Sequence, residues 1–307
     1  MKTLKAFGAL VCLAAALFLS FCGCAKKQEK GTIFFVSTRT GIAQLFSMRA
    51  DGSRQKRVTN DSFSNEAPWC SPDMKMVAYS SKRGATWDLF VMHTDGSSAV
   101  QLTRNSGDNC FPCWSPDGTM IAFQSNRDGL FRIYTMKSDG TGQRALSMPV
   151  PKGREPLKKF QYTHPAWVPG GKTLLAVREN GKNGIVVETD MEGKTSLPLT
   201  ETKALDTWPS FESSGKILLF ASNESDVFQI YGKERGEKGK RMVTGAWPGP
   251  DNFEPRWSPS GGSIIFTSRH TGTRQIFRMP AGPGGGRSLP TQLTRDKFDN
   301  YHPYWGS

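Results

Sequence analysis

The sequence has few of the residues on which most enzyme chemistry depends. It contains only 4 histidines in 307 residues, and they form no cluster with one another or with carboxylates. It has no GxSxG turn, no HExxH motif and no CxxCH motif, the marks of α/β-hydrolases, zinc proteases and c-type cytochromes. We therefore predict no catalytic residue, no metal and no cofactor, and the sequence favours a binding protein over an enzyme.

Sustained helical periodicity is absent after the first 23 residues. The 32 glycines and 19 prolines instead suit a chain with many tight turns, because glycine tolerates positive φ and proline fixes φ. The apolar segments between these turns have the length and composition of strands. The sequence thus predicts an all-β protein.

Acidic residues are outnumbered, with 27 Asp and Glu against 40 Lys and Arg and a formal net charge of +13. This excess favours acidic surfaces such as anionic lipid or acidic glycan. The basic residues are nevertheless scattered along the chain, which is typical of a solvated face. We expect no nucleic-acid partner.

Cysteines are few beyond the first 23 residues, at positions 24, 70, 110 and 113. Cys110 and Cys113 have CxxC spacing, but a redox pair needs a helix start, and on a strand the two side chains point to opposite faces. The alternation of side chains on neighbouring innermost strands permits a disulfide between Cys70 and Cys113 and excludes one between Cys70 and Cys110. Whether the permitted bond forms is left open.

The first 23 residues resemble a bacterial lipoprotein signal. A basic start precedes an apolar stretch from Ala6 to Phe21, and small Gly23 precedes Cys24, the expected lipid acceptor. Residues 24–31 would be a short tether. An uncleaved membrane anchor and an ordinary secretory signal are the alternatives. The prediction is a lipid-anchored protein of the bacterial cell envelope that faces the periplasm, with the outer membrane favoured.

A repeat with a period of about 44 to 53 residues fills the chain from residue 32 onward. Its clearest copy, Asp108 to Met136, alternates apolar segments with turns. Each copy has a proline at the same position of its first strand: Pro68, Pro112, Pro165, Pro209, Pro255 and Pro303. Two residues later stand Cys70, Trp114, Trp167, Phe211, Trp257 and Trp305. Four strands per unit at this period indicate a propeller blade.

The two ends of the repeat region complete each other. Thr32 to Ser37 matches the second strand of a unit, and Tyr304-Trp305 matches a first strand. Three strands from the N-terminal side and one from the C-terminal side would make one shared blade and remove the open sheet edges. We predict that residues 32–307 form a six-bladed β-propeller; an open solenoid is the alternative.

The repeat motifs resemble those of a known family. The third copy contains, in order, Trp114-Ser115-Pro116-Asp117-Gly118, Ile121-Ala122-Phe123, Ser125-Asn126-Arg127, Ile133-Tyr134-Thr135-Met136 and Asp139-Gly140. This set resembles the blade motif of the TolB family. The resemblance implies a six-bladed periplasmic propeller that binds the peptidoglycan-associated lipoprotein. TolB proteins also carry an N-terminal α/β domain, for which this sequence has no room.

The loops that lead into the innermost strands are the candidate binding surface, because they ring one mouth of the central channel. Short polar residues stand there beside aromatic residues, glutamates and histidines. The predicted ligand-binding residues are Asn65, Glu66, Asp108, Asn109, His164, Asp206, Trp208, Asn252, Glu254, Asn300 and His302. Their polar groups could bind a ligand or a cation, or only bond local backbone in turns.

Three further features concern the channel. His164 and His302 lie three blades apart, so they are poorly placed to share a metal. Glu254 and His302 lie on neighbouring blades and could meet, in a structural contact rather than as a general base. Trp69 stands one place before the tryptophan column, so its side chain is expected on the opposite face of the strand.

We predict a monomeric binding module that takes an envelope protein or peptide at the channel mouth, with a peptidoglycan-associated lipoprotein as one candidate. Six rigid blades would present the binding loops with little ordering cost. A propeller enzyme acting on an envelope glycan, a lyase or hydrolase, is the alternative. A scaffold that works through its outer blade edges is the third hypothesis.

Overall fold

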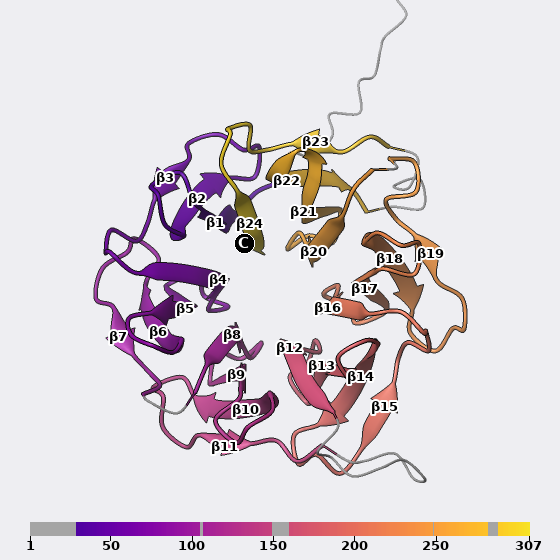
Figure 1. The fold of residues 1–307 in the computed structure, drawn as a ribbon, viewed down its shortest axis with the longest axis horizontal. Helices are drawn as coiled ribbons and strands as arrows, with labels where there is room; N and C mark the ends of the chain where they lie inside the picture. Colours follow the sequence, from indigo (N-terminus) through magenta and orange to yellow (C-terminus); the bar gives the residue numbers. More distant parts are fainter. Residues whose placement is uncertain (1–28, 105–106, 149–159, 248, 282–287) are drawn as a thin grey trace, which may run out of the picture.

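The computed structural model describes residues 29–104, 107–148, 160–247, 249–281 and 288–307; the leader and Cys24 lie outside these ranges. The described residues form six four-stranded antiparallel sheets that stand around a central axis, as Figure 1 shows. Within these ranges, no helix is long and apolar enough to cross a membrane. The prediction of an all-β, six-bladed propeller is confirmed.

Each blade contains three long strands and a short outermost one. The first blade consists of β24 (Asn300–Gly306), β1 (Thr32–Ser37), β2 (Gln44–Arg49) and β3 (Lys56–Arg57). The second and third consist of β4 (Ser64–Cys70), β5 (Met76–Lys82), β6 (Asp88–His93) and β7 (Val100–Gln101), and of β8 (Asn109–Trp114), β9 (Met120–Ser125), β10 (Arg132–Lys137) and β11 (Arg144–Ala145).

The other three blades follow the same order from the channel outward. The fourth consists of β12 (Gln161–Trp167), β13 (Thr173–Glu179), β14 (Gly184–Asp190) and β15 (Ser196–Pro198). The fifth and sixth consist of β16 (Asp206–Phe211), β17 (Ile217–Ser222), β18 (Gln229–Glu234) and β19 (Arg241–Met242), and of β20 (Asn252–Trp257), β21 (Ser263–Thr271), β22 (Thr273–Pro280) and β23 (Thr291–Gln292).

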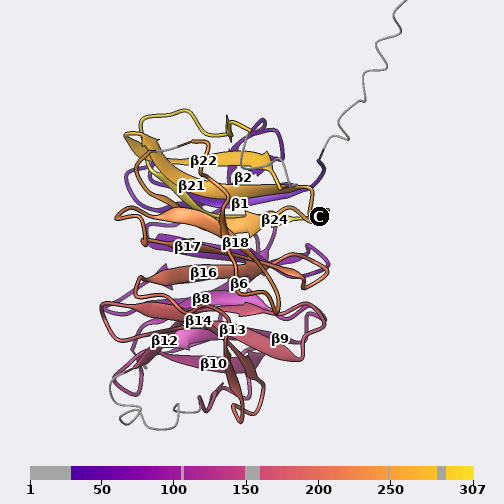
Figure 2. The same ribbon diagram turned by 90° about the vertical axis from the view of Figure 1, so that its right-hand side faces the viewer.

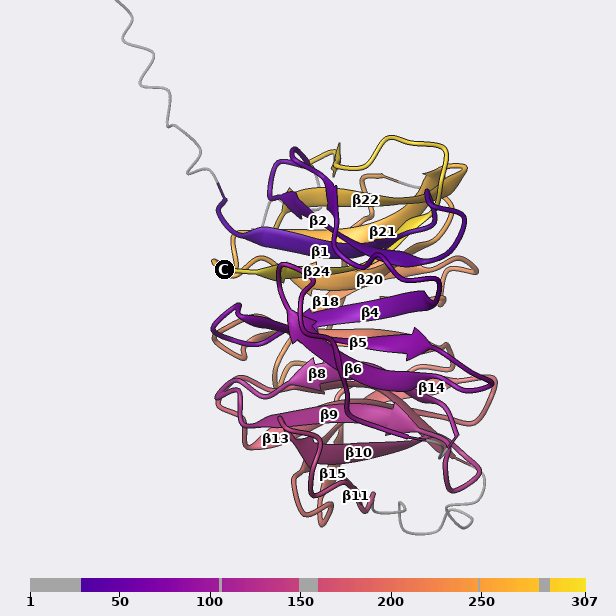
Figure 3. The same ribbon diagram turned by 90° about the vertical axis from the view of Figure 1, so that its left-hand side faces the viewer.

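The first blade closes the ring as predicted. β24 pairs antiparallel with β1, with Gly306 opposite Thr32 and Asn300 opposite Ser37. Figures 2 and 3 show β24 lying beside β1, with the C-terminus at the end of the channel where β1 begins. Because one blade contains strands from both ends of the repeat region, the ring has no unpaired innermost strand.

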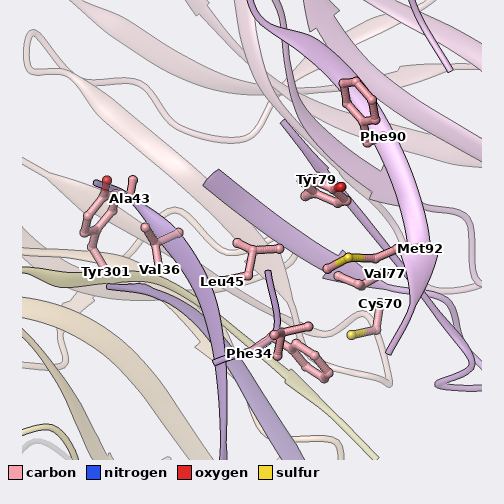
Figure 4. Packing of buried hydrophobic residues seen from close by; sticks show 11 residues of the cluster. Phe34, Val36, Ala43, Leu45, Cys70, Val77, Tyr79, Phe90, Met92 and Tyr301 are labelled. Carbon is pink, nitrogen blue, oxygen red and sulfur yellow. The ribbon is translucent and has the colours of Figure 1, made fainter. Parts of the chain in front are cut away.

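The hydrophobic core is divided among six clusters, and each lies between two neighbouring blades. Between the first and second blades, Phe34 and Leu45 pack against Val77 and Tyr79, and all four are at most 2% exposed (Figure 4). Burying one such side chain contributes about 1.5–3 kcal/mol. Since each blade covers its neighbour, no blade buries its faces alone.

A polar network also joins neighbouring blades. Thr103 Oγ1 donates to Asp88 Oδ1 (2.8 Å), and Asn109 Nδ2 of the next blade donates to the same oxygen (3.2 Å). The corresponding group between the fifth and sixth blades consists of Gln229, Thr244 and Asn252. These hydrogen bonds explain why the repeat contains a hydroxyl residue at its end and an asparagine at the start of the next innermost strand.

The tryptophan column consists of the tryptophans that stand two residues after the repeat proline: Trp114, Trp167, Trp257 and Trp305. Two of them connect neighbouring blades near the ends of the innermost strands. Trp167 Nε1 donates to the carbonyl oxygen of Cys113 (3.1 Å), and Trp257 Nε1 donates to that of Ser210 (3.2 Å). In each case the acceptor belongs to the innermost strand of the preceding blade. These two tryptophans thus help to fix the spacing of adjacent innermost strands, whereas Trp305 Nε1 donates to the carbonyl oxygen of Lys30 (3.1 Å).

The three cysteines in the described ranges, Cys70, Cys110 and Cys113, are free thiols. The permitted bond between Cys70 and Cys113 is not formed, because Cys70 packs between the first and second blades and Cys113 between the third and fourth. Burial raises the pKa of all three thiols, which makes the thiolate, and hence redox chemistry, unfavourable.

Candidate functional site

Five of the predicted binding residues begin or nearly begin an innermost strand and are fully buried. Their side chains are 0% exposed: Asn65, Asn109, Asp206, Asn252 and Asn300. Asn300 Nδ2 donates to Gln275 Oε1 (3.2 Å) and Asp296 Oδ1 (2.9 Å), for example, and its own Oδ1 accepts from Arg39 (3.0 Å). The four asparagines connect blades, whereas Asp206 accepts from Thr202 Oγ1 in the loop before its own strand (3.0 Å). None of the five presents a free surface at the mouth.

Asp108 has a similar connecting role. Its Oδ1 accepts a hydrogen bond from the backbone N–H of Trp87 (3.0 Å), and its own N–H donates to Asn126 Oδ1 (2.7 Å). The carboxylate therefore ties the loop before β8 to the preceding blade. The predicted residues that line the channel itself are His164, Trp208, Glu254 and His302.

Each innermost strand carries a β-bulge at the residue before its proline. The pairing register shifts there in all six blades, between Glu66 and Trp69 in the second blade, for example. We call these six residues the bulge ring. Its members, with their φ angles, are Ala67 (52°), Phe111 (53°), His164 (49°), Trp208 (49°), Glu254 (58°) and His302 (49°).

The conformation of the bulge ring is strained. A non-glycine residue with positive φ costs about 1–3 kcal/mol, and such residues gather at functional sites. A bulge redirects its side chain, and all six members of the ring line one central cavity. The same strained geometry, repeated in every blade, presents six different side chains to the channel.

Aromatic contacts fill much of the ring. The Phe111 ring centroid lies 4.9 Å from that of His164 and 5.2 Å from that of His302. His164 lies 5.2 Å from Trp208, which in turn lies 5.7 Å from Phe253. The two histidines of opposite blades are thus separated by an aromatic ring. Large apolar rings with polar edges are the side chains that dominate protein and peptide interfaces.

Glu254 and His302 meet, as their blade positions indicated. His302 Nε2 lies 3.1 Å from Glu254 Oε1, and Glu254 Oε2 accepts from the His302 backbone N–H (2.7 Å) and from Thr267 Oγ1 (2.6 Å). Burial alone would raise the pKa of Glu254, but the charge of His302 and these hydrogen bonds lower it to about 2. Burial opposes protonation of His302, yet Glu254 raises its pKa. The two form an ion pair.

His164 has the opposite character. Burial, together with the nearby positive charges of His302 and Arg256, lowers its pKa to about 3, so it is neutral at neutral pH. Its Nδ1 lies 3.0 Å from Thr163 Oγ1 and 3.3 Å from Thr207 Oγ1. The two channel histidines therefore differ in charge, although they occupy equivalent positions in their blades.

Glu66 completes the charged side of the channel. Its Oε1 accepts from the hydroxyl of Tyr301 (2.8 Å), and its Oε2 lies 4.0 Å from His302 Nδ1. Its side chain is 28% exposed, which makes it the accessible acid beside the ion pair. Among the predicted residues, Glu66, Glu254 and His302 are thus brought together.

Below the bulge ring, three large side chains close the channel, and we call them the plug. The Arg256 guanidinium lies 4.9 Å above the Trp69 ring, and Trp69 lies 5.0 Å from Tyr304. Trp69 also packs against the cluster between the second and third blades and, across the channel, against the clusters between the third and fourth and between the fourth and fifth blades. The small residues at the equivalent positions of the third, fourth and fifth blades leave the space: Cys113, Ala166 and Ser210.

A cavity of about 30 Å³ lies between the bulge ring and the plug, and its wall includes a proline from five of the blades. This is close to the volume of one water molecule in the liquid. The polar side chains in its wall are His164, Trp208, Glu254, Arg256 and His302. The cavity can therefore receive a small polar group, whereas a larger ligand would have to remain at the mouth.

The predicted binding residues did not include Ala67, Trp69, Phe111, Arg256 or the five prolines of the cavity wall. The sequence held a signal for two of them. Trp69 was expected on the face opposite the tryptophan column, and Arg256 occupies the same place directly after a proline. Extending the argument from Trp69 to its whole column would have found Arg256.

The site shows more of binding than of catalysis. Among the described residues, no three His, Cys, Asp or Glu side chains are grouped as metal ligands. Glu254 has both oxygens engaged and a pKa of about 2, so it is a weak base at neutral pH. What remains is a rigid aromatic mouth with an exposed acid and, beneath it, a small polar cavity.

The fold and this channel define a six-bladed propeller with a closed lower end. The TolB beta propeller domain family matches residues 52–156 and 150–279. These matches cover well over half of the sequence, and the chain belongs to the TolB β-propeller family.

Solved structures show the same fold at low sequence identity. TolB from Acinetobacter baumannii is 18% identical, with a TM-score of 0.74 over 90% of this chain and 66% of that one. A TolB structure from Agrobacterium tumefaciens is 19% identical, with a TM-score of 0.66 over 87% and 89%. An oligogalacturonate lyase in complex with manganese is 13% identical, with a TM-score of 0.54 over 83% and 87%. This chain thus spans slightly less than two thirds of the Acinetobacter protein.

Proposed function

We propose that this protein is a binding module of the bacterial envelope that takes a protein or peptide at the mouth of its central channel. The bulge ring is the observation that carries the proposal. The ring has one residue at positive φ in each blade, and this backbone conformation directs the side chains of its members, among them Phe111, His164 and Trp208, towards the channel. Strain of this kind is retained where it serves a site.

The rigidity of the mouth supports a binding role. The bulge ring is held by side chains of the preceding blades: the backbone N–H of Phe111 donates to Ser80 Oγ (3.2 Å), and that of His164 donates to Gln124 Oε1 (2.9 Å). A surface fixed in this way loses little entropy when a ligand binds. Exposed Glu66 would select ligands with a basic or hydrogen-bond-donating group.

The leader sequence supports the location that we propose, which is the periplasmic side of a membrane with a lipid on Cys24. The resemblance to TolB supports an envelope role and makes a peptidoglycan-associated lipoprotein a candidate partner. The enzyme alternative has less support, because Glu254 is engaged with His302 and Thr267 and no second free carboxylate lines the cavity among the described residues.

Cross-linking in cells tests the binding role. The full chain, tagged after Ser307, is cross-linked and purified beside a Trp208→Leu variant. The matched control is Leu197→Ala, which truncates a side chain that is 59% exposed at the outer edge of the fourth blade. We expect a partner that is captured by the wild type and the control and lost by Trp208→Leu. Capture that depends on Leu197 but not on Trp208 would place the function at the blade edge and contradict the proposal.

Labelling with a fatty-acid analogue tests the anchor. The wild-type chain should incorporate the label, and Cys24→Ser should not, while Cys70→Ser should still do so because that thiol is buried in the propeller. Equal labelling of all three would show that Cys24 is not the lipid acceptor.

A further inference from the structure

The cavity under the bulge ring contains hydrogen-bond donors that lack acceptors. Among the described residues, the partly exposed Arg256 guanidinium donates once, from Nη1 to the carbonyl oxygen of Pro255 (3.1 Å), although a guanidinium has five N–H groups and can donate further to a ligand. Trp208 Nε1 is buried and has no acceptor in the described part of the chain, and Trp Nε1 can only donate. Buried donors without acceptors are rare in proteins, and each calls for a partner.

The charge of Arg256 is not matched by a neighbouring carboxylate. Within the described ranges, no carboxylate oxygen lies within 4.0 Å of its guanidinium. Glu254, the only acid in the cavity wall, is already engaged by His302 and Thr267. Arginine stays protonated even when buried. Glu254 still acts on Arg256 through its charge, but its two oxygens are engaged by other groups, so within the described ranges the guanidinium has no carboxylate in direct contact.

The surroundings of Arg256 hold it in position. Its planar group lies 4.9 Å above the ring of Trp69, a cation–π contact that fixes its orientation. Trp69 is in turn fixed by Tyr304 and by three of the hydrophobic clusters between blades. A preorganised guanidinium matches the two oxygens of a carboxylate better than any other side chain.

We propose that the cavity binds a carboxylate group, held by Arg256 and by Trp208 Nε1–H, and that the ligand at the mouth is a peptide that presents this group. The identification of the ligand as a peptide rests on the proposed binding function. The cavity is small, about 30 Å³, so a terminal group such as a carboxylate is the part of the ligand that we expect to enter it. Ala67 is the smallest member of the bulge ring, so the ligand is expected to enter on that side.

Tryptophan fluorescence measures the carboxylate site directly, because Trp69 and Trp208 line the cavity. The full chain is titrated with sodium acetate, with sodium chloride at the same concentrations, and with acetamide, the neutral analogue. Acetate should give a saturable change that the other two do not. Arg256→Gln should weaken acetate binding at least tenfold and Arg256→Lys less, whereas exposed Arg49→Gln should leave it unchanged. No acetate-specific change in the wild type, or equal binding by Arg256→Gln, would overturn the site.

Arg256→Gln can fail to fold, so a second comparison is independent of it. Acetate should raise the Tm of the wild-type chain and of Arg49→Gln more than chloride does. The absence of any such difference between acetate and chloride contradicts the site even without the Arg256 variants.

Peptides identify the source of the carboxylate. Acetyl-tetraalanine with a free C-terminus, its C-terminal amide, and an amidated peptide with one glutamate are added in turn. The free acid or the glutamate peptide should compete with acetate, and Ala67→Leu should weaken the peptide at least tenfold. Acetate binding without peptide binding would show that the carboxylate is not presented by a peptide. A partner whose capture needs Trp208 but not Arg256 would leave the proposed function intact and refute this inference.

Discussion

At the scale of single residues, the bulge ring shows that position in the repeat fixes backbone shape while leaving side chains free to vary. Ala67, Phe111 and His164 have φ angles within a few degrees of one another, although their side chains share nothing. The shared conformation follows from the bulge. The side chains at these six positions can therefore differ in chemistry and serve to recognise a ligand.

The strain at Ala67 leads to a prediction about stability. Glycine adopts positive φ without penalty, so Ala67→Gly should leave the free energy of unfolding unchanged or raise it by about 0.5–1 kcal/mol. Ala78→Gly, at a fully buried position within β5 of the same blade, should lower it by about 1 kcal/mol or more. Urea unfolding of the two variants gives the comparison. Equal losses would show that Ala67 is not strained.

The Glu254–His302 pair makes stability depend on pH in a defined way. The lowered pKa of Glu254, about 2, stabilises the fold above the ordinary value near 4.5, and this is lost as the pH falls toward 2. The raised pKa of His302 stabilises the fold below its ordinary value of 6.5, and this is lost as the pH rises through the folded value. The contribution of the pair should therefore be largest between these limits.

Glu254→Gln tests this dependence. The variant should be less stable than the wild type by about 2–3 kcal/mol near pH 5.5, and the difference should narrow at pH 3 and at high pH. Loss of the Glu254 charge would lower the pKa of His164 further below about 3, so His164 is neutral in both proteins over most of this pH range. Urea midpoints from pH 3 to pH 9 supply the measurement, and two parallel curves would exclude the ion pair.

At the scale of strands and blades, the sequence repeat predicted the architecture but not the bulges. Four apolar segments per period and the matching ends led directly to six closed blades. The residue before a proline normally prefers extended backbone, so the left-handed conformation of Phe111 and its equivalents was not expected. It is imposed by pairing with the second strand, whose register shifts between Cys110 and Cys113, and by contacts with the preceding blade.

The polar residues at the start of the innermost strands show a second limit. Their periodic placement identified a repeated role, but the sequence could not distinguish a ligand-binding ring from a connection between blades. The deciding fact is the position of Asp88 and Gln229 on third strands, which reach the next blade only in the folded ring. For Trp69, by contrast, the alternation of side chains along a strand correctly placed it in the channel.

The connecting network carries a prediction of its own. Asn109→Ala removes hydrogen bonds from Asn109 Nδ2 to Asp88 Oδ1 and to the carbonyl oxygen of Gly107 (3.0 Å) and leaves buried groups unpaired. It should lower the free energy of unfolding by about 2 kcal/mol. Asn60→Ala, at an exposed loop position, should cost less than about 0.5 kcal/mol. Similar effects in urea unfolding would mean that the network adds nothing to blade cohesion.

At the scale of the whole molecule, stability depends on closure, because the six hydrophobic clusters all lie between blades. The clusters on both sides of the first blade include residues of β24, Tyr301 on one side and Trp305 on the other. Removing β24 therefore weakens two interfaces and exposes the edge of β1. In a ring, the loss of one interface also frees the blades on both sides of it.

A chain that ends at Asn300 should consequently lose its cooperative transition and unfold over a broad range of urea concentration. Removing only Ser307, an exposed residue, should leave the transition sharp. A synthetic peptide of residues 300–307, added to the truncated chain, should restore part of the cooperativity by pairing with β1. If the truncated chain melts like the full one, the blades are stable as an open array, and the strained ring around the channel is held by local contacts rather than by closure.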